Sequence, residues 1–242
     1  FGMHVHIGIE DRDLRIDIMN QMSYFMPHIL TLSTSSPFWR GQNTGFKSFR
    51  SIIFEDLPRT GIPEQFASAM EYDQYVRTLI SCKSIEDPSK IWWDIRPHST
   101  FPTLEFRICD CVTKLDDAMA IAALIQALVA KLIQFRQSNQ TWRKYRRSLI
   151  VENKWRACKN GINGKLIDFG QEQEISLRAL MEEMLEFVDD VVDPLGSRQE
   201  IEYIHTILEK GTSADRQIAC YEKTQSFKAV IDQLSKETLE NC

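Results

Sequence analysis

The sequence predicts an α+β fold in which strands come first and helices follow. Residues 2–9 alternate apolar and polar side chains with a period of two, which is typical of a strand with one buried face. Residues 91–97 and 103–109 repeat this alternation, and a short turn joins them. Beyond Asp116 the apolar residues recur with helical spacing almost to the end of the chain. Strands in one half and helices in the other indicate α+β rather than repeated β–α–β units.

The first half also contains two predicted helices and a long loop. Asp11 and Asp13 suit the first turn of a helix, where carboxylates accept hydrogen bonds from free N–H groups, and Pro27 is expected to bend it. Residues 35–61 are rich in glycine, proline and polar residues, which predicts a long loop of the kind that tends to be functional. A second helix is expected over residues 63–82, because a proline suits its first turn. The expected buried stripe of the first helix is Leu14, Ile18, Met22, Phe25 and Ile29.

The second half is predicted to be a series of helices with short breaks between them. Ser197 and Glu200 have the spacing of a capping box, which indicates a helix start. Gly161 and Gly211 are expected to end helices, because glycine adopts the backbone conformation that closes them. The expected helices are residues 116–138, 141–160, 177–193, 198–210, 214–223 and 227–240.

Length and composition limit the class of protein. The 242 residues carry 29 basic and 34 acidic side chains, and 43% are hydrophobic, which is typical of a globular protein and excludes a disordered one. The net charge of −5 argues against a dedicated nucleic-acid binder. Six cysteines without a CxxC pair predict reduced thiols and a cytoplasmic location. The longest apolar stretch, residues 118–133, is shorter than the ~20 residues that cross a bilayer, so we expect a buried helix and no membrane partner.

We expect a single catalytic domain over residues 1–242. Its sheet and active-site loops are assigned to residues 1–114, and its helical part to residues 115–242. The chain opens on Phe1, directly in a strand-like run, rather than on an initiator methionine. The sequence is therefore expected to lack an N-terminal part of the domain.

Two histidines share one face of the first predicted strand. His4 and His6 are two residues apart, which places them roughly 6–7 Å from each other along a strand. That spacing is too long for ideal ligation of one ion by the strand alone, but it suits a joint metal–phosphate cluster. A pair of solvated histidines, or of histidines satisfied in the core, has the same pattern, so the motif alone leaves both interpretations open.

Acidic and basic residues alternate along the two later strands. Glu105 and Arg107 share one face of the last strand, and Asp94 and Arg96 share one face of its neighbour. Such a face is costly to desolvate unless it meets a cation and a polyanion, and a nucleoside triphosphate with Mg²⁺ meets that need. The alternative is a surface ion pair, worth under about 1 kcal/mol.

The loop over residues 35–61 adds further basic residues. Its glycines permit a close approach of the backbone to phosphate, although the loop lacks GxxxxGK[ST]. GxGxxG, GxSxG and HExxH motifs are missing from the whole sequence as well. A basic surface loop is the alternative. A second basic segment, residues 142–156, is interpreted as a solvated helix face, with an RNA-binding surface as its alternative.

Segments along nearly the whole chain resemble one known family. The four segments in the first half are Gly2-Met3-His4-Val5-His6, Ser36-Pro37-Phe38-Trp39, Trp93-Asp94-Ile95-Arg96-Pro97 and residues 103–110. Residues 152–157, 166–170 and 211–217 agree in the second half. Together they resemble the YbdK-like carboxylate–amine ligases of the type-2 glutamate–cysteine ligase family. The resemblance implies a glutamine-synthetase-like antiparallel sheet with a mainly helical C-terminal half. It also implies ATP-dependent formation of γ-glutamylcysteine through a γ-glutamyl phosphate.

The resemblance further implies roles for individual residues. Members of the family begin with a strand that carries a Glu-x-Glu element and supplies further metal ligands. No residue precedes Phe1 in this sequence, so the metal site is expected to be only partly filled. The implied cofactors are ATP and Mg²⁺ or Mn²⁺. The expected metal ligands are His4 and Glu105, the expected ATP contacts are His6, Arg40 and Lys47, and the expected catalytic residues are Arg107, Arg50 and Arg96.

The expected partners are small molecules, namely glutamate and cysteine or another amine. No nucleic acid is expected, and the apolar helices favour a homodimer. The intact histidine pair, Glu105 and Arg107 favour an enzyme, with weak glutamate–cysteine ligase activity as the default. The alternative is a non-catalytic relative that binds nucleotide or a partner protein without turnover.

Overall fold

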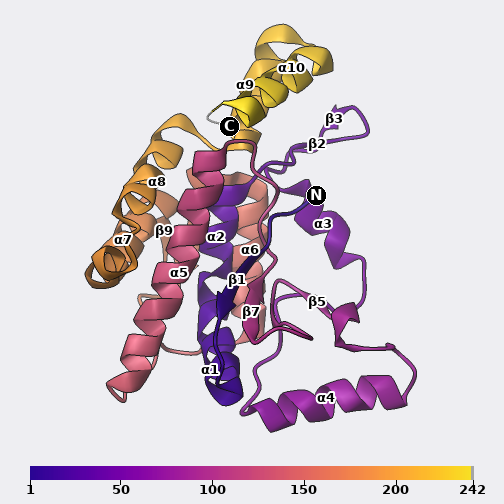
Figure 1. The fold of residues 1–242 in the computed structure, drawn as a ribbon. Coiled ribbons are helices and arrows are strands. Elements are labelled where there is room, and N and C mark those ends of the chain that lie inside the picture. Colours follow the sequence, from indigo (N-terminus) through magenta and orange to yellow (C-terminus); the bar gives the residue numbers. More distant parts are fainter. Residues whose placement is uncertain (241–242) are drawn as a thin grey trace.

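A computed structural model describes residues 1–240, in which a small three-stranded sheet lies on one side of a body formed mainly by ten α-helices (Figure 1). The strands are β1 (Val5–Gly8), β7 (Thr103–Phe106) and β6 (Ile95–Pro97), in the order β1–β7–β6. Both pairings are antiparallel, and β7 lies in the centre. The α+β prediction is confirmed, and the three strands lie within the expected ranges but are shorter.

The sheet has one apolar face and one polar face. Val5, Phe106 and Ile95 lie directly opposite one another across the three strands, and Phe106 and Ile95 are fully buried. Because successive side chains point to opposite faces of a strand, the residues that alternate with these three lie on the other face. The period of two read from the sequence therefore predicts correctly which residues share a face.

The segment that precedes β6 departs from the expected single strand over residues 91–97. A bend at Asp94 separates β6 from β5 (Trp92–Trp93), which pairs in parallel with β4 (Thr60–Gly61) instead. A short 3₁₀ turn, η2 (Pro88–Lys90), leads into β5. The bend ends β6 at Ile95, although the Arg107 N–H still donates to the Asp94 carbonyl oxygen at 2.7 Å.

Residues 35–61, expected as a loop, contain regular structure. A hairpin of β2 (Phe38–Trp39) and β3 (Gln42–Asn43) is followed by α3 (Phe49–Glu55). α3 is short and mostly half-buried, so it has no strong apolar stripe that would reveal it in the sequence. The prediction of a continuous loop is wrong at this helix.

The first helices form as the sequence indicates, with two differences in detail. Asp11 accepts a hydrogen bond from the Leu14 N–H at 2.8 Å and caps α1 (Arg12–Met22). A 3₁₀ turn, η1 (Ser23–Phe25), replaces a simple bend, and α2 (Met26–Ser33) follows with proline in its first turn. α4 (Ala69–Ser81) starts later than expected, because the Ser68 side chain caps it.

α5 (Leu115–Gln137) is the central helix of the second half. With 23 residues it is longer than the apolar stretch suggests, and its length and composition would suffice to cross a membrane. In the structure it packs against α1, α2, α7 (Leu177–Leu195) and α8 (Arg198–Lys210). It therefore serves as a core helix, as expected.

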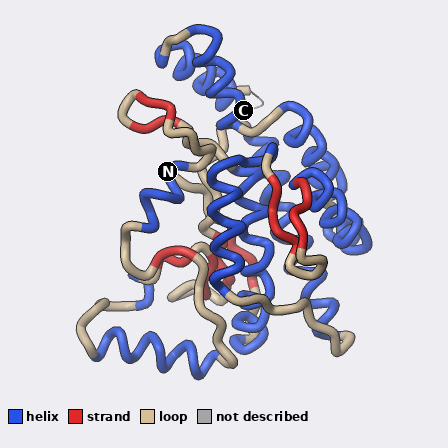
Figure 2. Tube along the Cα trace, turned by 180° about the vertical axis from the view of Figure 1, so that it is seen from behind, coloured by secondary structure: helices blue, strands red, loops and turns tan. Residues whose placement is uncertain are grey.

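The remaining elements complete the helical half. The hairpin of β8 and β9, drawn in red in the view from behind in Figure 2, was not expected from the sequence. Its strand β8 packs against α6. The capping box expected at Ser197 is not formed, since the Ser197 side chain makes no capping hydrogen bond, whereas Thr212 and Asp215 do form one. The elements not yet bounded are α6 (Arg147–Asn160), η3 (Gly161–Asn163), β8 (Lys165–Asp168), β9 (Gln173–Ser176), α9 (Ser213–Thr224) and α10 (Phe227–Leu239).

Candidate active site

A row of three charged or titratable side chains crosses the polar face of the sheet. His6 on β1 and Arg96 on β6 lie directly opposite Glu105 on the central strand β7. Directly opposite residues on neighbouring antiparallel strands bring their side chains into contact. The register of the sheet thus joins residues that are about a hundred positions apart in sequence.

Glu105 is the centre of this cluster, with only 3% of its side chain exposed. Its Oε2 accepts a hydrogen bond from Arg96 Nε at 2.8 Å, and its Oε1 accepts one from Arg107 Nη1 at 2.6 Å. His4 Nδ1 lies 3.2 Å and His6 Nε2 lies 3.8 Å from the same Oε1. Burial alone would raise the pKa of Glu105, but the hydrogen bonds from His4, Arg96 and Arg107 outweigh burial and hold that pKa well below its usual range.

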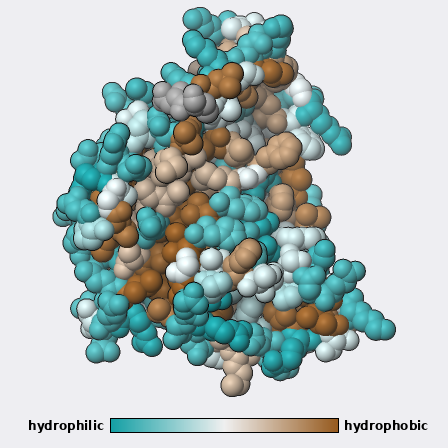
Figure 3. Space-filling view, viewed as in Figure 1, coloured by the Kyte–Doolittle hydropathy of each residue, from teal (hydrophilic) through white to brown (hydrophobic). Residues whose placement is uncertain are grey.

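The cluster carries more positive than negative charge. Two guanidinium groups face a single carboxylate, and the side chains of His4 and His6 are 35% and 36% exposed, so solvent reaches the cluster from their side. Figure 3 shows hydrophilic side chains beside hydrophobic patches on the molecular face that carries β1 and α5. An excess of arginine donors that solvent can reach is the usual arrangement for binding carboxylate or phosphate.

The two arginines differ in how many donors they have left. Arg96 also donates to the carbonyl oxygens of Ser89, at 2.9 Å, and of Ile91. Arg107 Nη1 lies 3.3 Å from His4 Nδ1, and Arg107 Nε is buried with no hydrogen-bond partner among the described residues. The Arg107 side chain is somewhat more exposed than that of Arg96, at 14% against 9%, and among the described contacts it donates to no carbonyl oxygen, so it is better placed than Arg96 to bind an incoming anion.

His6 connects the cluster to a neighbouring cavity. Its Nδ1 lies 3.1 Å from Thr103 Oγ1, and its ring meets the ring of His98 edge-on, with centroids 5.3 Å apart. Burial lowers the pKa of His6, although Glu105 acts to raise it. The lowered pKa favours a neutral imidazole at neutral pH. Thr103 and His98 were not among the residues selected from the sequence, although the period-two pattern does place Thr103 on the same face as Glu105.

The cavity beyond His98 has a volume of about 420 Å³, within the usual range for small-molecule sites. α1, α4 and the turn from Pro97 to Pro102 form its walls. In that turn His98 Nδ1 accepts hydrogen bonds from the N–H groups of Thr100 and Phe101, and its ring stacks on Phe101, which is 60% exposed. The cavity therefore offers stacked rings at its edge, next to the charged cluster.

Arg50 lies near the cluster, but its contacts are to the main chain. Its guanidinium donates to the carbonyl oxygens of Arg107 at 3.2 Å and Ile108 at 3.3 Å, and lies 3.7 Å from Asp110 Oδ1. A Cβ atom at Gly2 would lie 2.4 Å from Arg50 Nη2, so glycine is required for this close approach. These contacts support the backbone of Arg107 from below.

Asp94 does not join the Glu105 cluster: it lies opposite Arg107, one position beyond the pairing of Ile95 with Phe106. Because of the bend between β5 and β6, the Asp94 carboxylate binds Lys154 on α6, with Oδ2 2.7 Å from Nζ. Lys154 is buried, which corrects its assignment to a solvated basic face. Helical spacing from Ile150 through Lys154 to Ala157 and Cys158 is the sequence signal that could have placed it on the buried side.

Comparison with known proteins decides the family. The model of a family described as glutamate–cysteine ligase family 2 matches residues 1–237. The chain belongs to glutamate–cysteine ligase family 2. The resemblance of its motifs to that family is thereby confirmed.

Relatives in glutamate–cysteine ligase family 2 extend beyond the matched region. A protein from Herpetosiphon aurantiacus, named "Putative glutamate–cysteine ligase 2", is 56% identical over 240 residues, which cover 99% of this chain and 62% of the relative. A protein of the same name from Solibacter usitatus is 53% identical over 238 residues, which cover 98% of this chain and 62% of the relative. The chain thus spans about 62% of the length of these relatives.

A solved structure confirms the fold. The crystal structure of a glutamate–cysteine ligase from Francisella tularensis, in complex with AMP, superposes with a TM-score of 0.67 at 14% identity. The match covers 95% of this chain and 58% of that one. The predicted glutamine-synthetase-like fold of glutamate–cysteine ligase family 2 is therefore correct for this chain.

The metal site that the family resemblance implies is not complete among residues 1–240. His4 Nδ1 lies close to Glu105 Oε1, but both oxygens of Glu105 already accept hydrogen bonds from arginines. No group of three or more His, Cys, Asp or Glu side chains within residues 1–240 is arranged to hold a metal ion. This donor set fits an anion rather than a resident Mg²⁺ or Mn²⁺ ion, and the metal-ligand roles of His4 and Glu105 stay predictions.

The structure separates two of the expected ATP contacts from the cluster. Arg40 is exposed at the tip of the β2–β3 hairpin, which projects from the body of the molecule in Figure 1. Lys47 Nζ lies 2.7 Å from Asp215 Oδ1 on α9 and packs beside Gly161. Among residues 1–240, neither Arg40 nor Lys47 contacts His6, so their ATP-binding roles also stay predictions.

Proposed function

We propose that this chain belongs to an ATP-dependent carboxylate–amine ligase that joins glutamate to cysteine. The observation that carries this proposal is the cluster around Glu105, in which two arginines and two histidines share one carboxylate and solvent reaches the histidines. Membership of glutamate–cysteine ligase family 2 supports the same reaction class.

The reaction needs groups that bind and neutralise negative charge. A carboxylate is a poor electrophile, so the γ-phosphoryl group of ATP is first transferred to the γ-carboxylate of glutamate, which yields ADP and γ-glutamyl phosphate. The amino group of cysteine then attacks the acyl carbon, inorganic phosphate leaves, and the amine loses a proton as the amide forms. Phosphoryl transfer depends mainly on positioning and charge stabilisation, which arginines supply.

The described residues suit the two ends of ATP. Arg107, whose Nη1 contacts Glu105 and His4, binds the transferred phosphate or the substrate carboxylate, and His6 links the cluster to the cavity through the ring of His98. The cavity of about 420 Å³ has room for a nucleoside, and the stacked pair of His98 and Phe101 at its edge offers a flat surface to a purine. The AMP bound to the Francisella tularensis enzyme is in keeping with nucleotide use in such ligases.

A second candidate is a nucleotide-binding relative without turnover. One observation favours it: both carboxylate oxygens of Glu105 accept hydrogen bonds from arginines, which suits binding of an anion and occupies the oxygens that a catalytic metal ion would need. Under this proposal the cluster binds ATP, but glutamate and cysteine do not stimulate its hydrolysis.

Phosphate release from ATP separates the two candidates. The protein is incubated with ATP and Mg²⁺, or with ATP and Mn²⁺, and glutamate and cysteine are added separately and together. The ligase proposal predicts phosphate release that requires both amino acids, accompanied by γ-glutamylcysteine. ATP binding with no dependence on the amino acids would support the second candidate, and no ATP binding would contradict both.

The cytoplasmic location and the homodimer stay predictions. Light scattering after size-exclusion chromatography checks the second of them: a mass near 56 kDa, twice the 28.1 kDa of one chain, supports a dimer, and a mass near 28.1 kDa contradicts it.

A further inference from the structure

Lys154 is a buried charge outside the cluster. Only 3% of its side chain is exposed, and lysine is rarely buried to this degree unless it is paired. Its Nζ lies 2.7 Å from Asp94 Oδ2 and 3.3 Å from Glu55 Oε1. Burial acts to lower the pKa of Lys154, but Asp94 and Glu55 outweigh burial and raise it, so the ammonium group stays charged.

Asp94 lies next to Arg107 as well as to Lys154. The Arg107 N–H donates to the Asp94 carbonyl oxygen at 2.7 Å, which fixes the two residues beside each other just beyond the paired ends of β6 and β7. Both side chains, together with that of Lys154, line one small cavity of about 10 Å³. A space of this size holds at most one water molecule, so it is no ligand site.

Arg107 Nε is buried and has no hydrogen-bond partner among the described residues, although the Asp94 carboxylate belongs to a residue that lines the same small cavity. A guanidinium and a carboxylate at such close quarters pair readily when nothing else binds the carboxylate. Lys154 binds the Asp94 carboxylate instead and neutralises its charge. The guanidinium of Arg107 is thus left directed at Glu105 rather than at Asp94.

We infer that Lys154 is a positioning residue for the anion site: by holding Asp94, it prevents Asp94 from capturing Arg107 and keeps the Arg107 guanidinium on Glu105, in the cluster that binds the anionic ligand. The choice of ATP as the ligand rests on the proposed function, whereas the role of Lys154 in holding Asp94 does not. It also gives α6 a part in the site, since α6 supplies the side chain that keeps the sheet residue Arg107 in place.

The test compares the wild type with Lys154→Met, with the double variant Lys154→Met/Asp94→Asn, and with Lys228→Met as a control. Lys228 is exposed and pairs only with Asp232 on its own helix among the described contacts. Two measurements are made on each protein: the ¹⁵N–¹H NMR signal of Arg107 Nε, and the Kd of ATP by calorimetry.

Lys154→Met is expected to move the Arg107 Nε signal to the position of a carboxylate-bound guanidinium and to raise the Kd of ATP about tenfold. Replacing Asp94 as well removes the competing carboxylate, so the double variant is expected to restore both values. A residue that only stabilised the fold would show no such rescue. The control is expected to match the wild type.

Three results would overturn the inference: an unchanged Arg107 Nε signal in Lys154→Met, failure of the double variant to restore it, or a carboxylate-bound Nε signal already present in the wild type. The wild-type measurement decides even where Lys154→Met does not fold. If the wild type does not bind ATP, the proposed function fails, whereas the NMR comparison still tests the role of Lys154.

Discussion

Two clusters of buried charge differ in balance and in access to solvent. Around Glu105, two arginines and two histidines share one carboxylate, and the histidines are open to solvent. Around Arg216, one guanidinium lies 3.1 Å from the carboxylates of both Asp117 and Glu237. The second cluster thus has more negative than positive charge, and hydrogen bonds to Thr113 and to the Gly211 carbonyl oxygen complete it.

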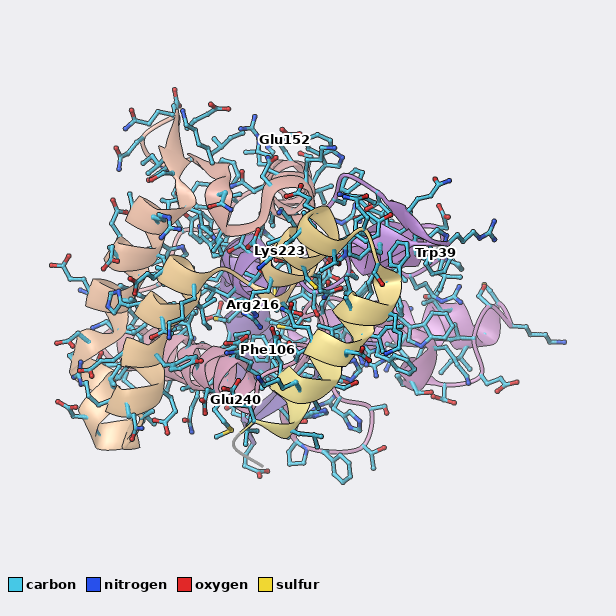
Figure 4. All side chains as sticks on the ribbon, turned by 90° about the horizontal axis from the view of Figure 1, so that it is seen from above. Trp39, Phe106, Glu152, Arg216, Lys223 and Glu240 are labelled. Carbon is cyan, nitrogen blue, oxygen red and sulfur yellow. The ribbon has the colours of Figure 1, made fainter. Side chains whose placement is uncertain are left out.

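The difference separates a binding site from a structural joint. The Arg216 cluster joins α5, α9 and α10, and Figure 4 shows Arg216 near the middle of the molecule, seen from above, with Trp39 at its edge. Its charged groups pair with one another. The Glu105 cluster has an excess of positive charge and histidines that solvent reaches, so an anionic ligand would complete its charge balance. The balance of charge is therefore a better guide to function than burial alone.

Replacing Glu105 should have the largest effect on the protein, because it removes the one carboxylate of its cluster. Glu105→Ala leaves two guanidinium groups facing each other without a counter-charge, which we expect to lower the free energy of unfolding by about 3–5 kcal/mol and to abolish ATP binding. Urea denaturation and calorimetry measure the two effects. Glu174→Ala, at an exposed ion pair with Arg156, is the matched control and should change neither. Unchanged ATP binding in Glu105→Ala would remove Glu105 from the site.

Removing Arg216 should affect stability alone. Arg216→Met leaves Asp117 and Glu237 unpaired, and we expect the free energy of unfolding to fall by about 3 kcal/mol. The Kd of ATP should stay at the wild-type value in conditions where the protein is folded. A loss of ATP affinity as large as that caused by changes at Arg107 would show that the two clusters are not functionally distinct.

Arg107→Lys should have the opposite profile. An ammonium group cannot reproduce the two-pronged contact of a guanidinium, so turnover is expected to fall about 10- to 100-fold. The positive charge next to Glu105 is kept, and the free energy of unfolding should change by less than about 1 kcal/mol. Steady-state phosphate release and urea denaturation provide the two numbers. Near-normal turnover would reduce Arg107 to a partner of Glu105 in the sheet.

The smallest expected difference between the two clusters is the order in which Glu105 and Asp117 titrate. The lowered pKa of Glu105 means that its stabilising contribution is present above the ordinary glutamate pKa of about 4.3 and is lost only as the pH falls towards the folded value. Burial raises the pKa of Asp117 against the effect of Arg216, so Asp117 binds a proton at higher pH and destabilises the fold when ionised. As the pH is lowered, carboxylate ¹³C NMR should show Asp117 binding its proton before Glu105 does. The reverse order would contradict this account of the two clusters.

Local patterns in the sequence predict the polar face of the sheet well. Alternation with a period of two places His6, Arg96 and Glu105 on polar faces, and pairing of the three strands then brings them together. Capping by Asp11 and the stop at Gly211 are likewise local and are read correctly.

What the sequence does not reveal depends on contacts between distant segments. The bend at Asp94 follows from pairing of β5 with β4, and the burial of Lys154 follows from the packing of α6 under that bend. Arg40 and Lys47 lie in one loop with Arg50, but the hairpin and α9 take them to other places. The β8–β9 hairpin was hidden because its strands are short and mostly exposed on one side.

The most direct test of the central claim follows the five histidine rings by NMR as ATP is added. His4 and His6 flank Glu105, His98 borders the adjacent cavity, His28 is buried in α2, and His205 pairs with Glu182 on the surface. If the cation-rich cluster binds the phosphates, the signals of His4, His6 and His98 shift in a saturable manner while those of His28 and His205 do not. Saturable binding that leaves His4 and His6 unshifted would contradict the account.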